Sequence, residues 1–346
     1  AEALAATPER DLMAEKILAI HFHQTGQIAR SLTHFRTVFE AEPDGQSALN
    51  IAICLVKLGK LAQARAFAEA ESTRIPMIEW HDLMGWISTR QNRIPDAVAH
   101  GNRALALKDA SAPPAPALEP VIRAFDASRP TRNVISFSLF GKDPRYLEGA
   151  RRNSVVARAL YPGWVARFYI DDRVPETVVD ALLAEGAQVM QPEGWPAERY
   201  GLFWRFIVED DPDVDLYLVR DADALMTIKE RVAVDDWLAS GRAFHLMRDL
   251  PSHAELVLAG MWGAHRGNLG SMATRVRDFL AGLPDEMNPK MRDQLFTRQV
   301  LWPVIRQSVC AHDTWFDFGE VRRFRPEYPL PPGRHIGQND WAVPKG

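Results

Sequence analysis

Two aspartates that follow an apolar run are the residues of this sequence best suited to carry chemistry. In Leu216–Met226 the apolar residues lead into Arg220, and Asp221 and Asp223 follow, one residue apart. On an extended chain, side chains at i and i+2 point to the same side, so these carboxylates repel each other unless a cation lies beside them. A hard divalent ion, Mg²⁺ or Mn²⁺, shared with substrate phosphates, is the natural partner. The alternatives are a surface loop or a helix cap.

Two other acid pairs have the same spacing but a different position. Asp211/Asp213 and Asp213/Asp215 precede the apolar run, on its amino side, where acidic residues ordinarily solvate a turn. The pair at 221 and 223 instead follows a strand-like segment. This position, more than the spacing, distinguishes it.

The residues around the aspartates alternate between strand-like and helix-like patterns. Runs rich in β-branched and aromatic residues predict strands, and apolar residues at three- and four-residue intervals predict helices. Strands are expected at 133–140, 164–171, 187–192 and 215–223, and helices at 144–161, 175–187 and 202–211. This order predicts a parallel sheet with helices on both faces, in which ligands bind beyond the carboxyl ends of the strands. The aspartates belong to that end.

The first ~110 residues repeat with a fixed period. Turn-forming, small and helix-boundary positions recur 33 residues apart: Gly26, Gly59 and Asn92; Ser31, Ala64 and Ala97; Pro43, Pro76 and Asp109. Apolar residues between them keep helical spacing, with Gly or Asn where one helix ends. The sequence therefore predicts an all-helical repeat unit in which small residues let paired helices approach closely.

This array resembles the tetratricopeptide repeat. The large–small pairs of that motif are Leu18-Ala19, Ile51-Ala52 and Met84-Gly85, whereas Ser88 in the third unit and Ser31 in the first depart from it. The resemblance implies a surface that binds a peptide or another subunit. Supporting the rest of the chain, or dimerising it, is the equal alternative.

A proline-rich segment separates the repeats from the remainder of the chain. Ser111–Pro120 reads SAPPAPALEP, which cannot continue a helix and is typical of a semi-rigid connector. The expected organisation is a repeat domain at 1–110, a linker at 111–131 and an α/β domain at 132–346.

Composition limits the class of protein. With 47% hydrophobic and 25% charged residues, the chain has the make-up of a soluble globular protein, and a net charge of −4 argues against a nucleic-acid partner. Two distant cysteines, Cys54 and Cys310, favour a reducing compartment over a disulfide framework. No apolar run approaches ~20 residues and the start does not resemble a signal peptide. We therefore expect a cytoplasmic protein without a transmembrane segment.

The ordered motifs of the second domain resemble bacterial glycosyltransferases of the GT-A type, some of which carry N-terminal tetratricopeptide repeats. The motifs are VISFSLFG, YPGWVARFYIDD, FWRF, LVRDADA, FHLMRD, LAGMWG, DQLF and HD, between about 133 and 315. The resemblance implies a Rossmann-like nucleotide-diphospho-sugar transferase domain. It also implies a UDP- or GDP-linked sugar as donor and Mn²⁺ or Mg²⁺ as cofactor.

The resemblance assigns the donor to residues from several strands and helices. These are Phe137, Ser138, Gly141, Arg145, Asp172 (or Asp171), Arg205, Arg220, Ala222, Gly260 and Trp262. Phe137 and Trp262 are equally compatible with the core, and Asp172 with a helix cap. Arg205 is expected to bind the diphosphate or support the motif, with an i,i+4 ion pair to Glu209 as its alternative. Arg220 is expected to balance the carboxylates.

The remaining assignments concern catalysis and the metal. Asp293, on an expected helix, and Asp249 are candidates for the acceptor base or for contacts to sugar hydroxyls, while helix capping competes for Asp293. His312, chosen over His335, is the expected third metal ligand beside Asp221 and Asp223, with a structural histidine as its alternative.

The predicted function is metal-dependent transfer of a sugar from a nucleotide diphosphate sugar to a hydroxyl of a polysaccharide, lipopolysaccharide or protein. Inverting and retaining chemistry both stay open. Two alternatives remain: a haloacid-dehalogenase-like phosphatase, and a non-enzymatic repeat scaffold with a degenerate α/β domain. A phosphatase of that kind usually begins its domain with the strand that carries the aspartates, whereas three strand–helix units come first here.

Overall fold

The structure is a computed structural model that describes residues 8–283 and 291–339. Two compact units divide the chain, Ala1–Ala110 with Pro251–Ala254, and Ser111–Leu250 with Glu255–Gly346. Over the described ranges, no helix is both long enough and apolar enough to cross a membrane.

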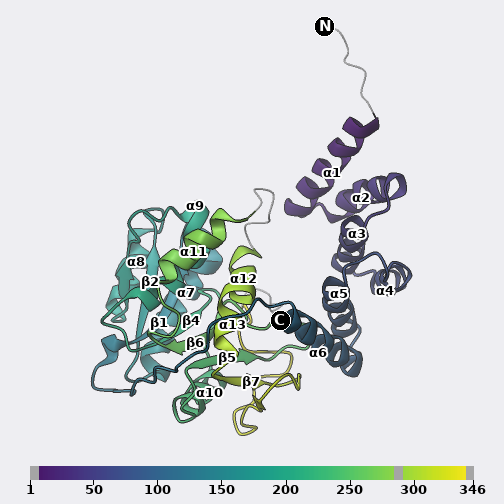
Figure 1. Ribbon diagram of the computed structural model, residues 1–346. Helices are drawn as coiled ribbons and strands as arrows, with labels where there is room; N and C mark the ends of the chain where they lie inside the picture. Colours follow the sequence, from purple (N-terminus) through teal and green to yellow (C-terminus); the bar gives the residue numbers. More distant parts are fainter. Residues whose placement is uncertain (1–7, 284–290, 340–346) are drawn as a thin grey trace. The chain divides into compact units, whose positions relative to one another are not determined.

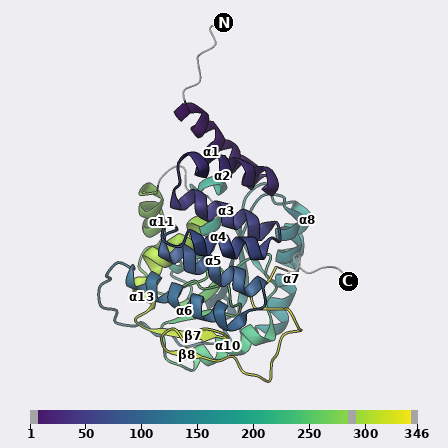
Figure 2. The ribbon, with the colours of Figure 1, turned by 90° about the vertical axis from the view of Figure 1, so that its right-hand side faces the viewer.

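The first unit consists of helices that follow one another in pairs (Figure 2). They are α1 (Pro8–Gln24), α2 (Ile28–Ala41), α3 (Gly45–Lys57), α4 (Leu61–Ala70), α5 (Met77–Arg90) and α6 (Ile94–Ala110). The repeated turn positions share one backbone geometry: Gly26, Gly59 and Asn92 have φ of 77°, 74° and 56°. Left-handed backbone favours glycine and tolerates asparagine, which explains why these residues recur with the period.

The small residues of the repeat lie where the helices meet. Ser31, Ala64 and Ala97 are each fully buried. Ser31 Oγ donates to the carbonyl oxygen of Ala19 on α1 (2.8 Å), which satisfies a hydroxyl that would otherwise be buried without a partner. Leu18 departs from the motif, since it remains 38% exposed on α1.

The linker expected at 111–131 belongs to the second unit, and its residues after the proline-rich run are hydrogen-bonded to that unit. Val121 and Asn268 exchange hydrogen bonds of 2.9 Å in both directions, and the backbone N–H of Arg123 donates to His265 Nδ1 (2.9 Å). The linker expected at 111–131 is therefore hydrogen-bonded to the α/β unit through its backbone at Val121 and Arg123.

The second unit is built on a sheet whose eight strands, within the described residues, lie in the order β3-β2-β1-β4-β6-β5-β7-β8. Strands β1, β2, β3 and β4 are mutually parallel, as predicted. Strand β6, which lies outside the four strands predicted to be parallel, runs antiparallel to both of its neighbours, so the sheet as a whole is mixed. The strands are β1 (Asn133–Leu139), β2 (Val165–Ile170), β3 (Gln188–Met190), β4 (Leu216–Arg220), β5 (Phe244–Arg248), β6 (Met261–His265), β7 (Val309–Asp313) and β8 (Val321–Arg322).

Helices connect and cover these strands (Figure 1). The α-helices are α7 (Pro144–Leu160), α8 (Glu176–Ala184), α9 (Ala197–Tyr200), α10 (Ile228–Leu238), α11 (Met272–Ala281), α12 (Arg292–Phe296) and α13 (Trp302–Ile305). The segment expected as a helix at 202–211 is a 3-10 helix, η2 (Gly201–Asp210), and Thr297–Leu301 forms a π-helical turn, η4. Asp143 caps α7 by accepting the Arg145 N–H, and Pro144 occupies the first helical turn.

The order of the strands defines where a ligand is expected. From β1 the chain first proceeds to β2 and β3 on one side and then to β4 on the other. Such a reversal is a topological switch point, and open α/β sheets bind ligands in the crevice beyond the carboxyl ends of the strands at that point. The segments after β1, β2 and β4 are therefore the place to look for a site.

Candidate functional site

Asp221 and Asp223 stand directly beyond β4, at the switch point. The strand ends at Arg220, and a turn follows in which the N–H of Ala224 donates to the carbonyl oxygen of Asp221 (3.3 Å). The Asp221 side chain is 42% exposed and that of Asp223 14%. Burial, followed by the charge of Asp221, raises the pKa of Asp223. The two carboxylates therefore repel each other, as the spacing predicts.

Arg205, on η2, joins Asp221 to Asp293. One guanidinium nitrogen pairs with Asp221 Oδ1, and the other lies 2.8 Å from Asp293 Oδ2. The alternative pair with Glu209 does not form, because Glu209 accepts the N–H groups of Gly267 and Leu269 instead. Burial alone would lower the pKa of Arg205, but the neighbouring carboxylates outweigh burial and raise it. This arginine is thus permanently charged inside the site.

Strand β1 fixes the backbone of Arg205. Ser136 Oγ donates to its carbonyl oxygen (2.7 Å), and Ser138 Oγ accepts its N–H (3.0 Å). Both serines are buried. Ser138, expected to contact a donor nucleotide, therefore contributes here by holding Arg205.

Asp223 has partners from two distant parts of the chain. Arg145 Nε, on α7, lies 3.4 Å from Asp223 Oδ2. The side-chain amide of Asn339 donates to the same oxygen (2.7 Å), and a β-bridge joins Asn339 to Ala224. Nothing in the sequence pattern placed Asn339 in the site, since it is separated from Asp223 by 116 residues.

Asp293 lies inside the first turn of α12 rather than capping it. The N-cap is Met291, which makes no side-chain cap, so the capping alternative for Asp293 is not what the structure shows. Asp293 is 6% exposed, and burial raises its pKa although Arg205 opposes the shift. It is a basic carboxylate linked to Asp221 through one arginine.

Gly260 makes room for the Asp221 carboxylate. A Cβ atom at Gly260 would lie 2.5 Å from Asp221 Cγ, closer than the 3.0 Å that real Cβ contacts respect, and its oxygen Oδ2 would be closer still. The backbone of Gly260 therefore forms one wall of the site. A side chain at this position would displace the carboxylate.

The carboxylate oxygens of Asp221 and Asp223 suit a hard divalent cation whose remaining coordination positions are filled by water or by a bound substrate. In the described part of the chain, no group of three or more His, Cys, Asp or Glu side chains could hold a metal. Mg²⁺ is ordinarily bound by one or two carboxylates together with waters and substrate phosphates rather than by an all-protein cage. Asp221 and Asp223 supply such a pair, and the glycine at 260 gives the Asp221 carboxylate the space that a side chain there would occupy.

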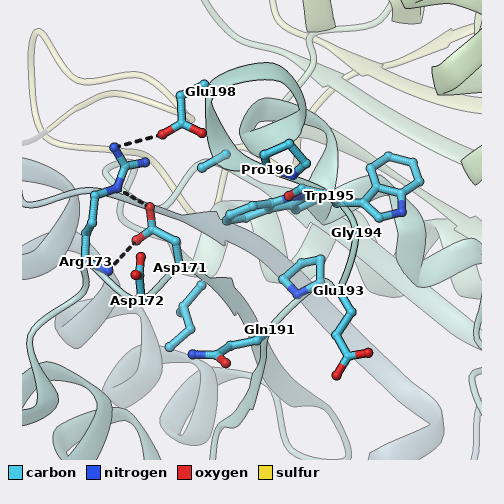
Figure 3. A pocket seen from close by; sticks show the side chains of 13 residues that line it. Asp171, Asp172, Arg173, Gln191, Glu193, Gly194, Trp195, Pro196 and Glu198 are labelled. Atoms are coloured by element: carbon cyan, nitrogen blue, oxygen red, sulfur yellow. Dashed lines mark hydrogen bonds and ion pairs between the residues drawn. The ribbon is translucent and has the colours of Figure 1, made fainter.

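A cavity of about 610 Å³ lies beyond the carboxyl ends of β2 and β3 (Figure 3). Its walls include Asp171 and Asp172, and the segment 191–198. Asp171 accepts the N–H of Gly141 (3.1 Å) and pairs with Arg173 (2.6 Å). Asp221 and Asp223 do not line this cavity, but Trp204, which does, directly precedes Arg205. Of the expected donor residues, Asp172 lines the cavity, and Gly141 contacts its wall through Asp171.

Asp249 serves to fasten the C-terminal segment. Its carboxylate accepts from Lys229 Nζ (2.7 Å), from the hydroxyl of Thr314 and from the backbone N–H of Ile336 (2.9 Å). Both oxygens are therefore engaged by protein groups. This arrangement supports a positioning role for Asp249, because Ile336 leads to Asn339 beside Asp223.

Two aromatic residues expected at the donor site lie in the core. Phe137 is fully buried and stacks on Phe168, with ring centroids 4.7 Å apart. Trp262 is also fully buried, between Phe206 and Tyr217. Neither ring is open to a base or a sugar, because a sheet covered on both faces buries successive residues of each strand.

Arg220 and Ala222 are likewise directed away from a ligand. Arg220 is fully buried and pairs with Glu230 on α10 (3.1 Å), not with the aspartates, because neighbouring residues of a strand point to opposite faces. Ala222 is buried in the core and contributes its backbone to the turn. The expected pairing of Arg220 with the aspartates is therefore not formed, and the side chains of both residues are buried in this structure.

His312 is not brought to the aspartates. It lies on β7, separated from β4 by β6 and β5. Its Nδ1 is 3.3 Å from His245 Nε2, and its Nε2 is 3.6 Å from Asp236 Oδ2. Burial lowers its pKa to about 4, so it is a neutral core histidine. The structural alternative for His312 is the one the structure supports.

The comparisons with known proteins find matches among solved structures alone. No protein-family model matches the chain, and no curated protein matches it. Among solved structures, it is similar to an O-GlcNAc transferase mutant of Thermobaculum terrenum, with a TM-score of 0.32 and 13% identity. The likeness covers 60% of this chain and 45% of that one, less than half of its length. The chemistry of the site is therefore inferred from its own residues.

Proposed function

We propose that the α/β unit transfers a glycosyl group from a nucleotide diphosphate sugar to a hydroxyl acceptor, with Mn²⁺ or Mg²⁺ held by Asp221 and Asp223. One observation carries the proposal. At the switch point of the sheet stands a carboxylate pair, half-exposed at Asp221 and largely buried at Asp223, and Arg205 links Asp221 to a third, buried carboxylate, Asp293. Such a set of opposite charges suits a polyanion that arrives together with a cation.

Arg205 and Arg145 are the groups proposed to bind the diphosphate of the donor. Arg205 and Arg145 contact Asp221 and Asp223 respectively, and a planar guanidinium can bind phosphate oxygens in a bidentate manner. When bound, the metal would neutralise charge that develops on the leaving diphosphate. The two arginines add fixed positive charge at the same place, and Ser136 and Ser138 keep Arg205 from moving away.

The cavity beyond β2 and β3 suits the nucleoside half of the donor. Asp171, Asp172, Glu193 and Glu198 line it, and Arg173 pairs with Asp171 and Glu198. An excess of carboxylates repels phosphate but accepts hydrogen bonds from ribose hydroxyls and base N–H groups. We therefore place base and ribose in the cavity and the phosphates towards Arg145 and Arg205.

Asp293 is our candidate for the acceptor base. Burial raises its pKa, which makes its ionised form a stronger base than an exposed aspartate. In an inverting reaction it would take the proton of the attacking hydroxyl. In a retaining reaction it would instead hold Arg205 against the diphosphate through their 2.8 Å ion pair.

The test is release of UDP or GDP from a panel of nucleotide sugars, with polysaccharide, lipopolysaccharide and protein acceptors as separate arms. Replacing Asp221 and Asp223 together by Asn should reduce turnover by at least ~10²–10³-fold, the loss typical for one electrostatic group at a transition state. Asp213→Asn, in the turn before β4, is the matched control and should turn over normally. Undiminished release in the double variant contradicts the proposal. Hydrolysis of a simple phosphomonoester in place of sugar transfer would favour the phosphatase.

A further inference from the structure

The turn that carries Asp221 and Asp223 is held by helix α7. After β4 ends at Arg220 the chain leaves the sheet, and α10 begins at Ile228. The backbone groups of this turn need partners outside the strand ladder, because buried peptide groups without hydrogen bonds are costly. Three of these partners come from one side chain, Asn153 on α7.

Asn153 binds the turn at three points. Its amide nitrogen donates to the carbonyl oxygens of Ala222 (3.1 Å) and Ala224 (3.0 Å), and its amide oxygen accepts the N–H of Met226 (3.1 Å). Asn153 itself is fully buried. A carboxamide supplies two donors and an acceptor on one short side chain, which matches the two carbonyls and one N–H that the turn presents.

Gly149 completes the contact one helical turn earlier. A Cβ atom at this position would lie 2.7 Å from Asp223 Cα, within the distance that real Cβ atoms avoid. Residues four apart share one face of a helix, so Gly149 and Asn153 meet the turn together. Gly149 sets how closely α7 approaches, and Asn153 then fixes the path of the chain.

We infer that Asn153 and Gly149 are positioning residues that hold Asp221 and Asp223 at the spacing needed for a divalent cation. Neither residue would touch the cation or the substrate. This inference rests on the proposed function for its metal, whereas the restraint on the turn can be measured without any metal. Residues that orient metal ligands typically change metal affinity by about 10–100-fold when they are replaced.

The experiment compares three variants of the full chain. Asn153→Ala removes the three hydrogen bonds. Gly149→Ala pushes α7 off the turn although alanine favours a helix more than glycine does, so lost helix stability cannot explain its effect. Ala157→Gly weakens the same helix at a buried position whose methyl side chain makes no hydrogen bond to the turn, and it serves as the destabilised control.

Two readouts are taken: Mn²⁺ affinity by electron paramagnetic resonance, and hydrogen exchange at the amide of Met226. Asn153→Ala and Gly149→Ala should weaken Mn²⁺ binding about 10–100-fold, and Asn153→Ala should accelerate exchange at Met226. Ala157→Gly should do neither beyond its global loss of stability. Unchanged exchange at Met226 in Asn153→Ala overturns the inference, as does equal Mn²⁺ affinity in all three variants. Wild-type protein that binds no Mn²⁺ even when UDP or GDP is present, with exchange still accelerated in Asn153→Ala, refutes the proposed function while the turn restraint stands.

Discussion

Replacing Gly260 by alanine tests the geometry of the carboxylate pair with the smallest possible change. The new Cβ would stand 2.5 Å from Asp221 Cγ, so the carboxyl carbon must retreat by about 0.5 Å to reach the 3.0 Å limit of real contacts, and the oxygen Oδ2, which would be closer still, must move further. Mg²⁺ demands near-ideal geometry at about 2.0–2.1 Å from each oxygen, and a ligand displaced this far no longer meets that requirement. We expect Mn²⁺ or Mg²⁺ affinity to fall about 10–100-fold, or about 1.4–2.7 kcal/mol.

Isothermal titration of Mn²⁺ into Gly260→Ala and wild type measures this loss, and urea unfolding of both proteins separates it from a change in stability. Gly282→Ala is the matched control, because its Cβ would meet its nearest atom at an ordinary 3.7 Å, and φ there is −89°. Equal affinity in Gly260→Ala, Gly282→Ala and wild type would refute the placement of the cation at Asp221. Loss in both variants alike would point to a general effect of the added methyl group.

Three further predictions concern stability. Burial raises the pKa of Glu209 to about 7 from 4.5. The stabilising contribution of Glu209 is therefore complete below pH ~4.5 and is lost as the pH rises through ~7. Glu209→Gln should remove up to about 3 kcal/mol of that decline in the free energy of unfolding, measured by urea unfolding between pH 5 and 8. Burial lowers the pKa of His312 to about 4 from 6.5, so its contribution to stability is present above pH ~6.5 and is lost as the pH falls through ~4. His312→Phe should therefore reduce the loss of stability at acid pH and leave Mn²⁺ affinity unchanged. A large loss of Mn²⁺ affinity would restore His312 as a metal ligand. Asn92 has φ of 56°, so Asn92→Ala should lower the free energy of unfolding by about 1 kcal/mol while Asn92→Gly is tolerated, and equal thermal stability of the two variants would contradict the role given to this turn.

The periodic and local features of this fold could be read from the sequence. The 33-residue recurrence of Gly26, Gly59 and Asn92 marks turns that share a left-handed backbone, and the strand–helix alternation gave β1 to β4 in parallel. The reversal of β6 could not be read, because direction in a sheet depends on which strands become neighbours, not on the pattern of any one strand.

The residues of the candidate site also include some that the sequence could predict and some that it could not. Asp221 and Asp223 were recognisable because a strand precedes them, and Arg205 because it lies on the preceding helical segment. The sequence predicts that Arg220 balances the aspartates, but Arg220 pairs with Glu230 on α10 instead. No spacing rule connects these two residues, so the sequence pattern could not predict this pair. No sequence pattern points to Asn153, because its role depends on hydrogen bonds to three backbone groups that lie beside it only in the folded chain.

Crystals soaked with Mn²⁺ and UDP or GDP give the most direct measurement of the central claim. Anomalous scattering at the manganese edge should show one ion bonded to both Asp221 and Asp223 and to the diphosphate, with the base in the cavity lined by Asp172. A nucleotide bound elsewhere, or manganese that avoids both aspartates at saturating concentration, would contradict the account.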